Sequence, residues 1–208
     1  RILYFIILLF DNLLKTANRK YLKQRIYQKL RDNYIQSVIS NKKLILFTPS
    51  IHTRIRAENI NEHEPETIEW IKKFKKKKLN EQIIFWDIGA CVGQFSLISS
   101  LLHENILSYA FEPSTKNLNI ISTNISINKF KKKIIICPLP LSNTNFDINI
   151  MNEKINEEGK ASNFFDNMND IDLNFKYSTL GISIDYLVDN KIFKTPDYIK
   201  IDTDGQER

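Results

Sequence analysis

The chain has 208 residues, which fits one domain or one domain with an appendage. Hydrophobic residues make up 42% of it and charged residues 26%, which excludes wholesale disorder, and five glycines and six prolines exclude collagen-like and low-complexity proteins. The two cysteines, Cys91 and Cys137, exclude a disulfide scaffold and indicate free thiols in a reducing compartment, so we expect a cytoplasmic protein.

The formal net charge is +6, and much of the excess lies in two lysine runs. One contains Lys72, Lys73 and residues 75–78, and the other contains Lys129 and residues 131–133. Such runs can attract nucleic acid or anionic lipid, so a non-enzymatic basic module that binds membranes or nucleic acid is one alternative. No nucleic-acid motif accompanies the runs, and both precede apolar stretches. We therefore expect solvated lysines beside core elements and no nucleic-acid partner.

The N-terminal residues are first apolar and then basic. The run from Ile2 to Phe10 is shorter than the about 20 residues that cross a bilayer, so we expect a helix packed on the domain; the tail of a signal or membrane segment is the alternative. Residues 15–39 have near-helical spacing, which predicts a helix; an amphipathic helix that contacts a membrane surface is the alternative. We assign residues 1–43 to an N-terminal helical region and residues 44–208 to the main domain. The first residue is Arg1 and the last is Arg208, directly after an acidic cluster, so we expect a fragment cut at both ends.

Strand and helix patterns alternate along the main domain. Short runs rich in β-formers predict strands over residues 44–47, 83–88, 106–111, 134–137 and 198–201, with a weaker strand over 146–151. Helical spacing predicts helices over residues 91–103, from Ser114 to residue 125, and over 183–190. The Asn- and Asp-rich residues 152–178 predict a long loop. This alternation predicts an α/β fold with a mostly parallel sheet and helices on both of its faces.

The strongest local signal for function is the turn Asp87-Ile88-Gly89-Ala90-Cys91-Val92-Gly93, where the strand over 83–88 meets a helix. Glycines let the backbone turn tightly and approach a ligand, and the following helix N-terminus offers N–H groups to a carboxylate or phosphate. Glu112 ends the next strand about 20 residues later, where a carboxylate accepts hydrogen bonds from ribose hydroxyls. The combination indicates an adenosine-containing cofactor.

The spacing of the glycines and the acidic residue before them bear on which cofactor binds. A dinucleotide site prefers G-x-G-x-x-G, whereas the chain has G-x-x-x-G directly after Asp87, a carboxylate that disfavours a pyrophosphate. S-adenosylmethionine carries no phosphate, so the sequence favours it over NAD. A NAD-type oxidoreductase domain remains the alternative.

Several further strings share their order and spacing with a known family. They are residues 64–70 (EPETIEW), 85–90 (FWDIGA), 111–113 (FEP), 141–142 (LS), 184–187 (IDYL) and 199–207 (IKIDTDGQE). On these strings, the chain over residues 45–208 resembles the FkbM family of S-adenosylmethionine-dependent methyltransferases. The resemblance implies a class I, Rossmann-like methyltransferase fold, usually with seven strands of which one is antiparallel. It implies that the last strands are missing here, and that a sugar or natural-product hydroxyl, on a small molecule or a glycan, accepts the methyl group.

The resemblance also implies roles for individual residues. The resemblance places the glycine turn at the methionine end of the cofactor, with Asp87, Gly89, Ala90 and Gly93. Glu112 is implied to hold the ribose.

Further along the chain, Leu141 and Ser142 are implied to border the adenine and Asp202 to face the methyl-transfer centre. Asp202, Asp204 and Glu207 are the candidate bases for a hydroxyl acceptor. The family more often has Asn at the position of Cys91 and Glu at that of Asp204.

Two further groups of residues, the arginines before residue 64 and the histidines, are candidates for ligand contacts. Arg54 and Arg56 either reach the cofactor carboxylate or an acidic substrate, or only decorate a strand. The histidines, His52, His63 and His103, lack metal-ligand spacing, so we expect no metal site.

Overall fold

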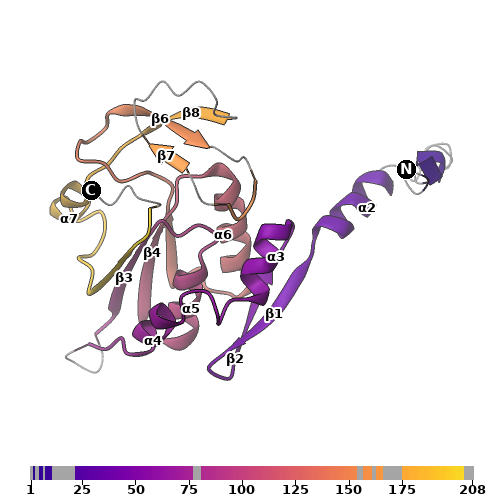
Figure 1. Cartoon of the computed structure of the whole chain (residues 1–208). Helices are drawn as coiled ribbons and strands as arrows, with labels where there is room; N and C mark the ends of the chain where they lie inside the picture. The colour runs from indigo at the N-terminus through magenta and orange to yellow at the C-terminus, as the bar shows by residue number, and fades with distance from the viewer. Residues whose placement is uncertain are drawn as a thin grey trace.

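The computed structural model describes residues 22–76, 81–153, 157–160, 163–165 and 175–203, together with residues 2, 5, 6 and 8–10. Its centre is a four-stranded parallel sheet in the order β5-β4-β3-β9 (Figure 1). The strands are β3 (Ile83–Ile88), β4 (Ile106–Phe111), β5 (Ile134–Cys137) and β9 (Tyr198–Ile201). Every residue of β3 is buried, as expected for a central parallel strand covered on both faces. All four strands lie where the sequence predicts them.

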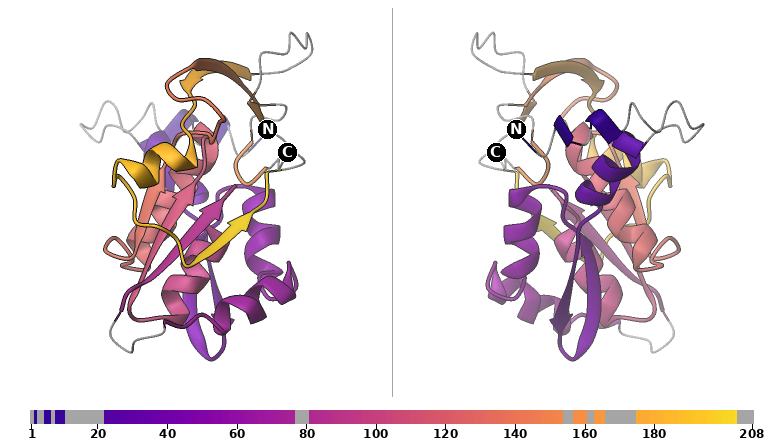
Figure 2. Two further views of the ribbon diagram at one scale, coloured as in Figure 1. Left: turned by 90° about the vertical axis from the view of Figure 1, so that its left-hand side faces the viewer. Right: turned by 90° about the vertical axis from the view of Figure 1, so that its right-hand side faces the viewer.

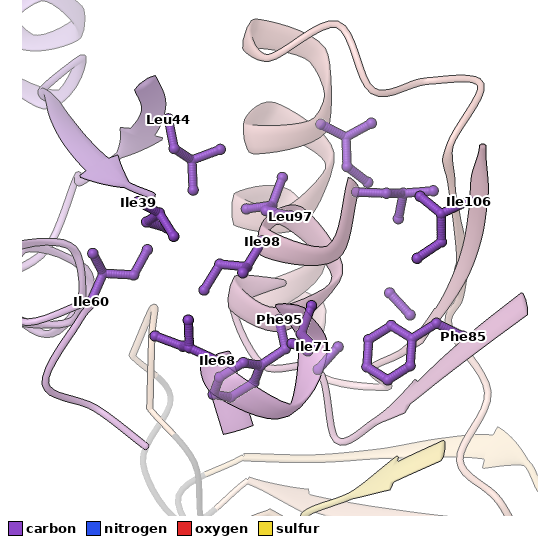
Figure 3. Packing of buried hydrophobic residues seen from close by; sticks show 14 of the residues in the cluster. Ile39, Leu44, Ile60, Ile68, Ile71, Phe85, Phe95, Leu97, Ile98 and Ile106 are labelled. Atoms are coloured by element: carbon purple, nitrogen blue, oxygen red, sulfur yellow. The ribbon is translucent and has the colours of Figure 1, made fainter. Parts of the chain in front are cut away.

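Helices cover both faces of this sheet, so the predicted α/β, Rossmann-like class is confirmed. On one face, α5 (Gln94–Leu102) and α6 (Thr115–Ile127) connect β3 to β4 and β4 to β5, and α4 (Pro65–Lys72) packs beside α5. Phe85, Leu97 and Ile98 belong to the core on that face (Figure 3). On the other face, Trp86 packs in a second cluster with Leu187 of α7 (Ile184–Asp189). Figure 2 shows α4 and α7 on opposite sides of the strands.

An antiparallel hairpin packs on the outside of the helical layer. It consists of β1 (Tyr34–Ile39) and β2 (Lys42–Phe47). Its turn residues, Ser40 and Asn41, have φ values of 47° and 63°, as in the two-residue turns that suit the twist of a hairpin. Ile39 and Leu44 are buried in the same cluster as Phe85, so the hairpin belongs to the core (Figure 3). Helix α3 (Ile51–Glu58) follows it and begins with a capping box.

The predictions for the N-terminal residues are partly wrong. Residues 15–21 lie outside the described residues; of residues 22–39, helix α2 covers Leu22–Arg31, and the β-branched residues after it form β1. The described residues of the first apolar run are mostly exposed, with Ile2 80% and Leu9 63% accessible, so they do not pack on the domain as expected. The hairpin already covers the outer surface of the helical layer. The domain boundary after residue 43 stays a prediction, and residue 43 itself lies within β2.

The predicted loop over residues 152–178 is also wrong in part. A second antiparallel sheet has the order β7-β6-β8, with β6 (Ile148–Glu153), β7 (Asn163–Phe165) and β8 (Phe175–Leu180). The sequence does not predict β7 and β8 because polar residues such as Asn152 and Lys176 obscure the alternation typical of strands. Pairing between segments distant in the sequence holds these strands. This sheet lies beyond the carboxyl ends of β3 and β4 (Figure 1).

The chain segments before β6 and after β8 lie side by side next to the second sheet. Leu141 forms a parallel bridge with Ile182, the Ser142 N–H donates to the Ile182 carbonyl at 3.0 Å, and the Ile182 N–H donates to Pro140 at 3.2 Å. Residues 143–181 are therefore an excursion with adjacent ends.

Among the described residues, no helix combines the length and the apolar character that crossing a bilayer requires.

Candidate functional site

The glycine turn joins the carboxyl ends of three neighbouring strands. Gly89 and Gly93 have φ values of 77° and 80°, which glycine adopts without steric cost. The N–H groups of Gly89 and Ala90 both donate to the carbonyl of Phe111 at the end of β4, at 3.0 and 2.9 Å. The Asp202 N–H, at the end of β9, donates to the carbonyl of Ile88 at 3.0 Å. The turn therefore lies in the middle of the edge where ligands bind in open α/β sheets.

Asp87, just before this turn, links the end of β3 to the start of α5. Its carboxylate Oδ2 accepts hydrogen bonds from the N–H and the hydroxyl of Ser96, at 2.9 and 2.8 Å, in the first turn of α5. The side chain is fully buried, and burial raises the pKa of Asp87. Asp87 therefore takes up one of the helix N–H groups that the sequence analysis assigned to a ligand.

Glu112 is buried at the end of β4, and backbone amides hold both of its carboxylate oxygens. Oε2 accepts from the N–H of Cys91 in the glycine turn, and Oε1 accepts from the N–H of Ser114, each at 2.8 Å. Burial, opposed by these amide hydrogen bonds and aided by the nearby carboxylate of Glu153, raises the pKa of Glu112 to about 7. The residue thus ties the glycine turn to the start of α6.

A cavity of about 880 Å³ lies over this edge of the sheet. Five of the residues predicted to bind the cofactor line it: Gly89, Glu112, Leu141, Ser142 and Asp202. Three others, Asp87, Ala90 and Gly93, do not line it and instead shape the turn behind it. Of the candidate bases, Asp202 lines the cavity, and Asp204 and Glu207 lie outside the described residues.

A buried lysine that the sequence analysis did not single out organises the acidic groups beside Asp202. Lys200 is 9% exposed, and its Nζ lies 3.0 Å from the Asp202 carboxylate and 3.7 Å from that of Glu64. The same ammonium lies 4.7 Å from the centroid of the Phe95 ring. Alternation along β9 would instead have placed Ile199 and Ile201 on the buried face, so no local pattern indicated a buried Lys200, and only the fold brings Glu64 to it.

The cavity has a further wall made by segments outside the parallel sheet. Arg56 of α3, His63 and Glu64 before α4, and Lys160 of the excursion all line it. Arg54 does not line it and pairs instead with Glu58 at 2.8 Å. The structure therefore separates the two arginines that the sequence analysis treated together.

Among the residues that the structure describes, no group of three or more His, Cys, Asp and Glu side chains is arranged to hold a metal ion. The histidines have other contacts: His52 pairs with Glu157 at 2.9 Å, and His103 lies 2.8 Å from the carbonyl of Ile71.

No protein-family model matches the chain, and no curated protein sequence matches it either. Solved structures of methyltransferases resemble parts of it. A precorrin-6Y methyltransferase from Geobacter metallireducens matches with 21% identity and a TM-score of 0.30, over 36% of this chain and 37% of that one. A SAM-dependent methyltransferase from Agrobacterium tumefaciens matches with 14% identity and a TM-score of 0.38, over 50% of this chain and 32% of that one.

The C-terminal domain of the precorrin-6Y methyltransferase from Rhodobacter capsulatus matches with 16% identity and a TM-score of 0.29, over 42% of this chain and 39% of that one. The match thus spans only about a third to two fifths of each of these three proteins. The likenesses name no family for the chain, and its fold class rests on its own sheet and helices.

Proposed function

We propose that this chain carries the cofactor site of an S-adenosylmethionine-dependent methyltransferase of the FkbM type. The observation that carries the proposal is the position of Glu112 in the cavity. Its carboxylate lies at the end of the strand next to β3, beside the glycine turn, where ribose hydroxyls bind in nucleotide sites of this fold. Each carboxylate oxygen accepts one backbone N–H and keeps a lone pair for a hydroxyl donor.

The residues around the cavity fit this cofactor. A volume of about 880 Å³ is in the range of pockets that hold drug-sized ligands. Leu139, Leu141 and Ile184 line it and pack against one hydrophobic cluster, which gives it apolar surface suited to an adenine ring. Asp87 supports S-adenosylmethionine over NAD, because its carboxylate already occupies a first-turn N–H of α5, where a pyrophosphate would bind.

The chemistry that we propose is methyl transfer to a hydroxyl group of a sugar or small natural product. S-adenosylmethionine, when bound, supplies an electrophilic methyl group on a sulfonium centre. Asp202 is half-exposed at the cavity, and we assign it the proton of the acceptor hydroxyl as the new C–O bond forms and the C–S bond breaks. Lys200 holds the Asp202 carboxylate in place. Asp204 and Glu207 stay proposed as further bases.

The choice of a hydroxyl acceptor rests on the resemblance of residues 45–208 to the FkbM family. We propose membership of the FkbM family on the same resemblance, and a cytoplasmic location on the two free cysteines, Cys91 and Cys137.

The test is calorimetric titration of the full chain with S-adenosylhomocysteine and, separately, with NAD. We expect the first ligand alone to bind, and Glu112→Ala to abolish its binding. Glu104→Gln is the matched control, because Glu104 is exposed at the other end of the sheet, before β4. Binding of NAD, or equal binding of S-adenosylhomocysteine to the wild type and Glu112→Ala, would contradict the proposal.

A further inference from the structure

The cations that line the cavity come from outside the parallel sheet. Arg56 projects from α3, and Lys160 belongs to the excursion between β6 and β7. The Lys160 carbonyl accepts from the amide of Asn117 at 3.1 Å and lies 4.0 Å from Cys91 Sγ in the glycine turn. Residues 157–160 therefore lie beside the part of the cavity that the glycine turn forms.

Arg56 is held in one orientation by this segment. Its Nε donates to the carbonyl of Gly159 at 2.9 Å. Gly159 is fixed in turn, because its N–H donates to Asn117 Oδ1 at 2.9 Å and a Cβ at this position would lie 2.9 Å from the side chain of Thr53. Among the described residues, the Nη atoms of Arg56 have no hydrogen-bond partner. A guanidinium with its Nε fixed presents these Nη atoms as a ready donor group.

The acidic groups of the cavity do not neutralise Arg56. The carboxylates of Glu64 and Asp202 both lie within 4.0 Å of Lys200 Nζ, at 3.7 and 3.0 Å. Both oxygens of Glu112 accept backbone N–H groups. Asp185, in α7, also lines the cavity and pairs with no cation among the described residues. Among the described residues, Arg56 therefore has no carboxylate as an ion-pair partner, and its charge is open to an anionic group of a ligand.

We propose that Arg56 binds the carboxylate of the methionine part of S-adenosylmethionine, an inference that rests on the proposed function. The carboxylate is the one anionic group of that cofactor, and the glycine turn is where its methionine end is expected. An arginine fork binds a carboxylate through paired, charge-assisted hydrogen bonds. Arg56 is thus a cofactor-binding residue supplied by an element that precedes the parallel sheet in the sequence.

The test compares two ligands on the full chain by calorimetry. One is S-adenosylhomocysteine, and the other is its decarboxylated analogue, which keeps the amine and lacks the carboxylate. We expect the wild type to bind the first more tightly by about 10- to 100-fold, and Arg56→Gln to remove that preference by weakening the first ligand alone. Arg54→Gln, in the same helix but outside the cavity, should keep the preference.

Arg56→Lys extends the test, because lysine keeps the positive charge but lacks the paired donors of the guanidinium. We expect this variant to keep part of the preference for S-adenosylhomocysteine over its decarboxylated analogue. Equal affinity of the wild type for the two ligands would overturn the assignment of Arg56. Equal weakening of both ligands in Arg56→Gln and Arg56→Lys would also overturn it, because a purely structural role affects both. If the wild type binds neither ligand, the proposed function itself fails and this inference fails with it.

Discussion

A Cβ atom at Gly89 would lie 1.8 Å from the carbonyl oxygen of Asp202. The end of β9 therefore approaches the glycine turn so closely that no side chain fits between them. This contact places Asp202, a candidate base, next to Gly89 in the wall of the cavity. Position 89 therefore requires glycine for two reasons: there is no space for a Cβ atom, and the φ value is 77°.

Replacement of Gly89 by alanine should destabilise the fold strongly. Alanine is strained in the left-handed backbone conformation, and its Cβ atom would overlap the Asp202 carbonyl and force β9 away from β3. We therefore expect a loss of more than about 3 kcal/mol in the free energy of unfolding. Gly93→Ala is the comparison, because its Cβ would meet only the side chain of Ile121, at 3.3 Å, and should cost about 1–2 kcal/mol. Urea denaturation measures both; equal losses would contradict the explanation.

The stability of the protein should fall as the pH rises from about 4.5 to about 7. The pKa of Glu112 rises on folding from its ordinary 4.5 to about 7, so in this window the folded chain keeps a proton that the unfolded chain has lost. The contribution of the protonated Glu112 to the free energy of unfolding is fully present below pH 4.5 and is lost by about pH 7. It amounts to at most about 3 kcal/mol. Burial raises the pKa of Asp87 in the same direction.

Glu112→Gln removes this contribution, and Glu104→Gln keeps it. Chemical denaturation at pH 5 and pH 8 gives the difference for each variant. The same pH dependence in Glu112→Gln and in the wild type would show that Glu112 is not its source.

Replacement of Asn124 by alanine should loosen the N-terminal hairpin. The buried amide of Asn124, in α6, accepts from the N–H of Phe47 at 2.8 Å and donates to the carbonyl of Val92 at 3.2 Å. Alanine leaves both backbone groups without these partners, so we expect a loss of about 2–3 kcal/mol, and faster amide exchange at Phe47. Asn128→Ala, one helical turn later and more exposed, should cost less. A smaller loss at Asn124 than at Asn128 would argue against this role.

Asp202→Asn should slow methyl transfer and leave cofactor affinity little changed. Loss of a general base reduces turnover by about 100- to 10,000-fold, whereas an amide of the same shape keeps the cavity. Turnover is measured with isotopically labelled S-adenosylmethionine and an accepted hydroxyl compound, and affinity with S-adenosylhomocysteine. Asp189→Asn, on the exposed side of α7, is the control. Unchanged turnover in Asp202→Asn would remove the residue from the reaction.

The parallel sheet could be predicted from the sequence because each of its strands has a local signal. The strands β3, β4, β5 and β9 occupy the predicted residues, since short runs rich in β-branched and aromatic residues, such as Ile83–Ile88, are typical of buried strands. The site at their carboxyl ends followed from the positions of Gly89 and Glu112 along the chain.

The rest of the site depends on contacts that local patterns do not encode. The roles of Lys200 and Arg56 come from partners such as Glu64 and Gly159, far away in sequence. Strand β1 was missed because the apolar spacing of residues 34–39 also suits a helix, although Asn41 in a two-residue turn is a hairpin signal. Strand β8 was missed because pairing with β6, more than composition, holds it.

The bridge between Leu141 and Ile182 has an evolutionary consequence. Because residues 143–181 begin and end at adjacent points, evolution can lengthen, trim or exchange this stretch as a cassette without rerouting β5 or α7. Lys160 and Met151, which both line the cavity, belong to that cassette. New ligand preferences can therefore arise by swapping one contiguous piece of sequence, while the parallel sheet and its glycine turn stay as they are.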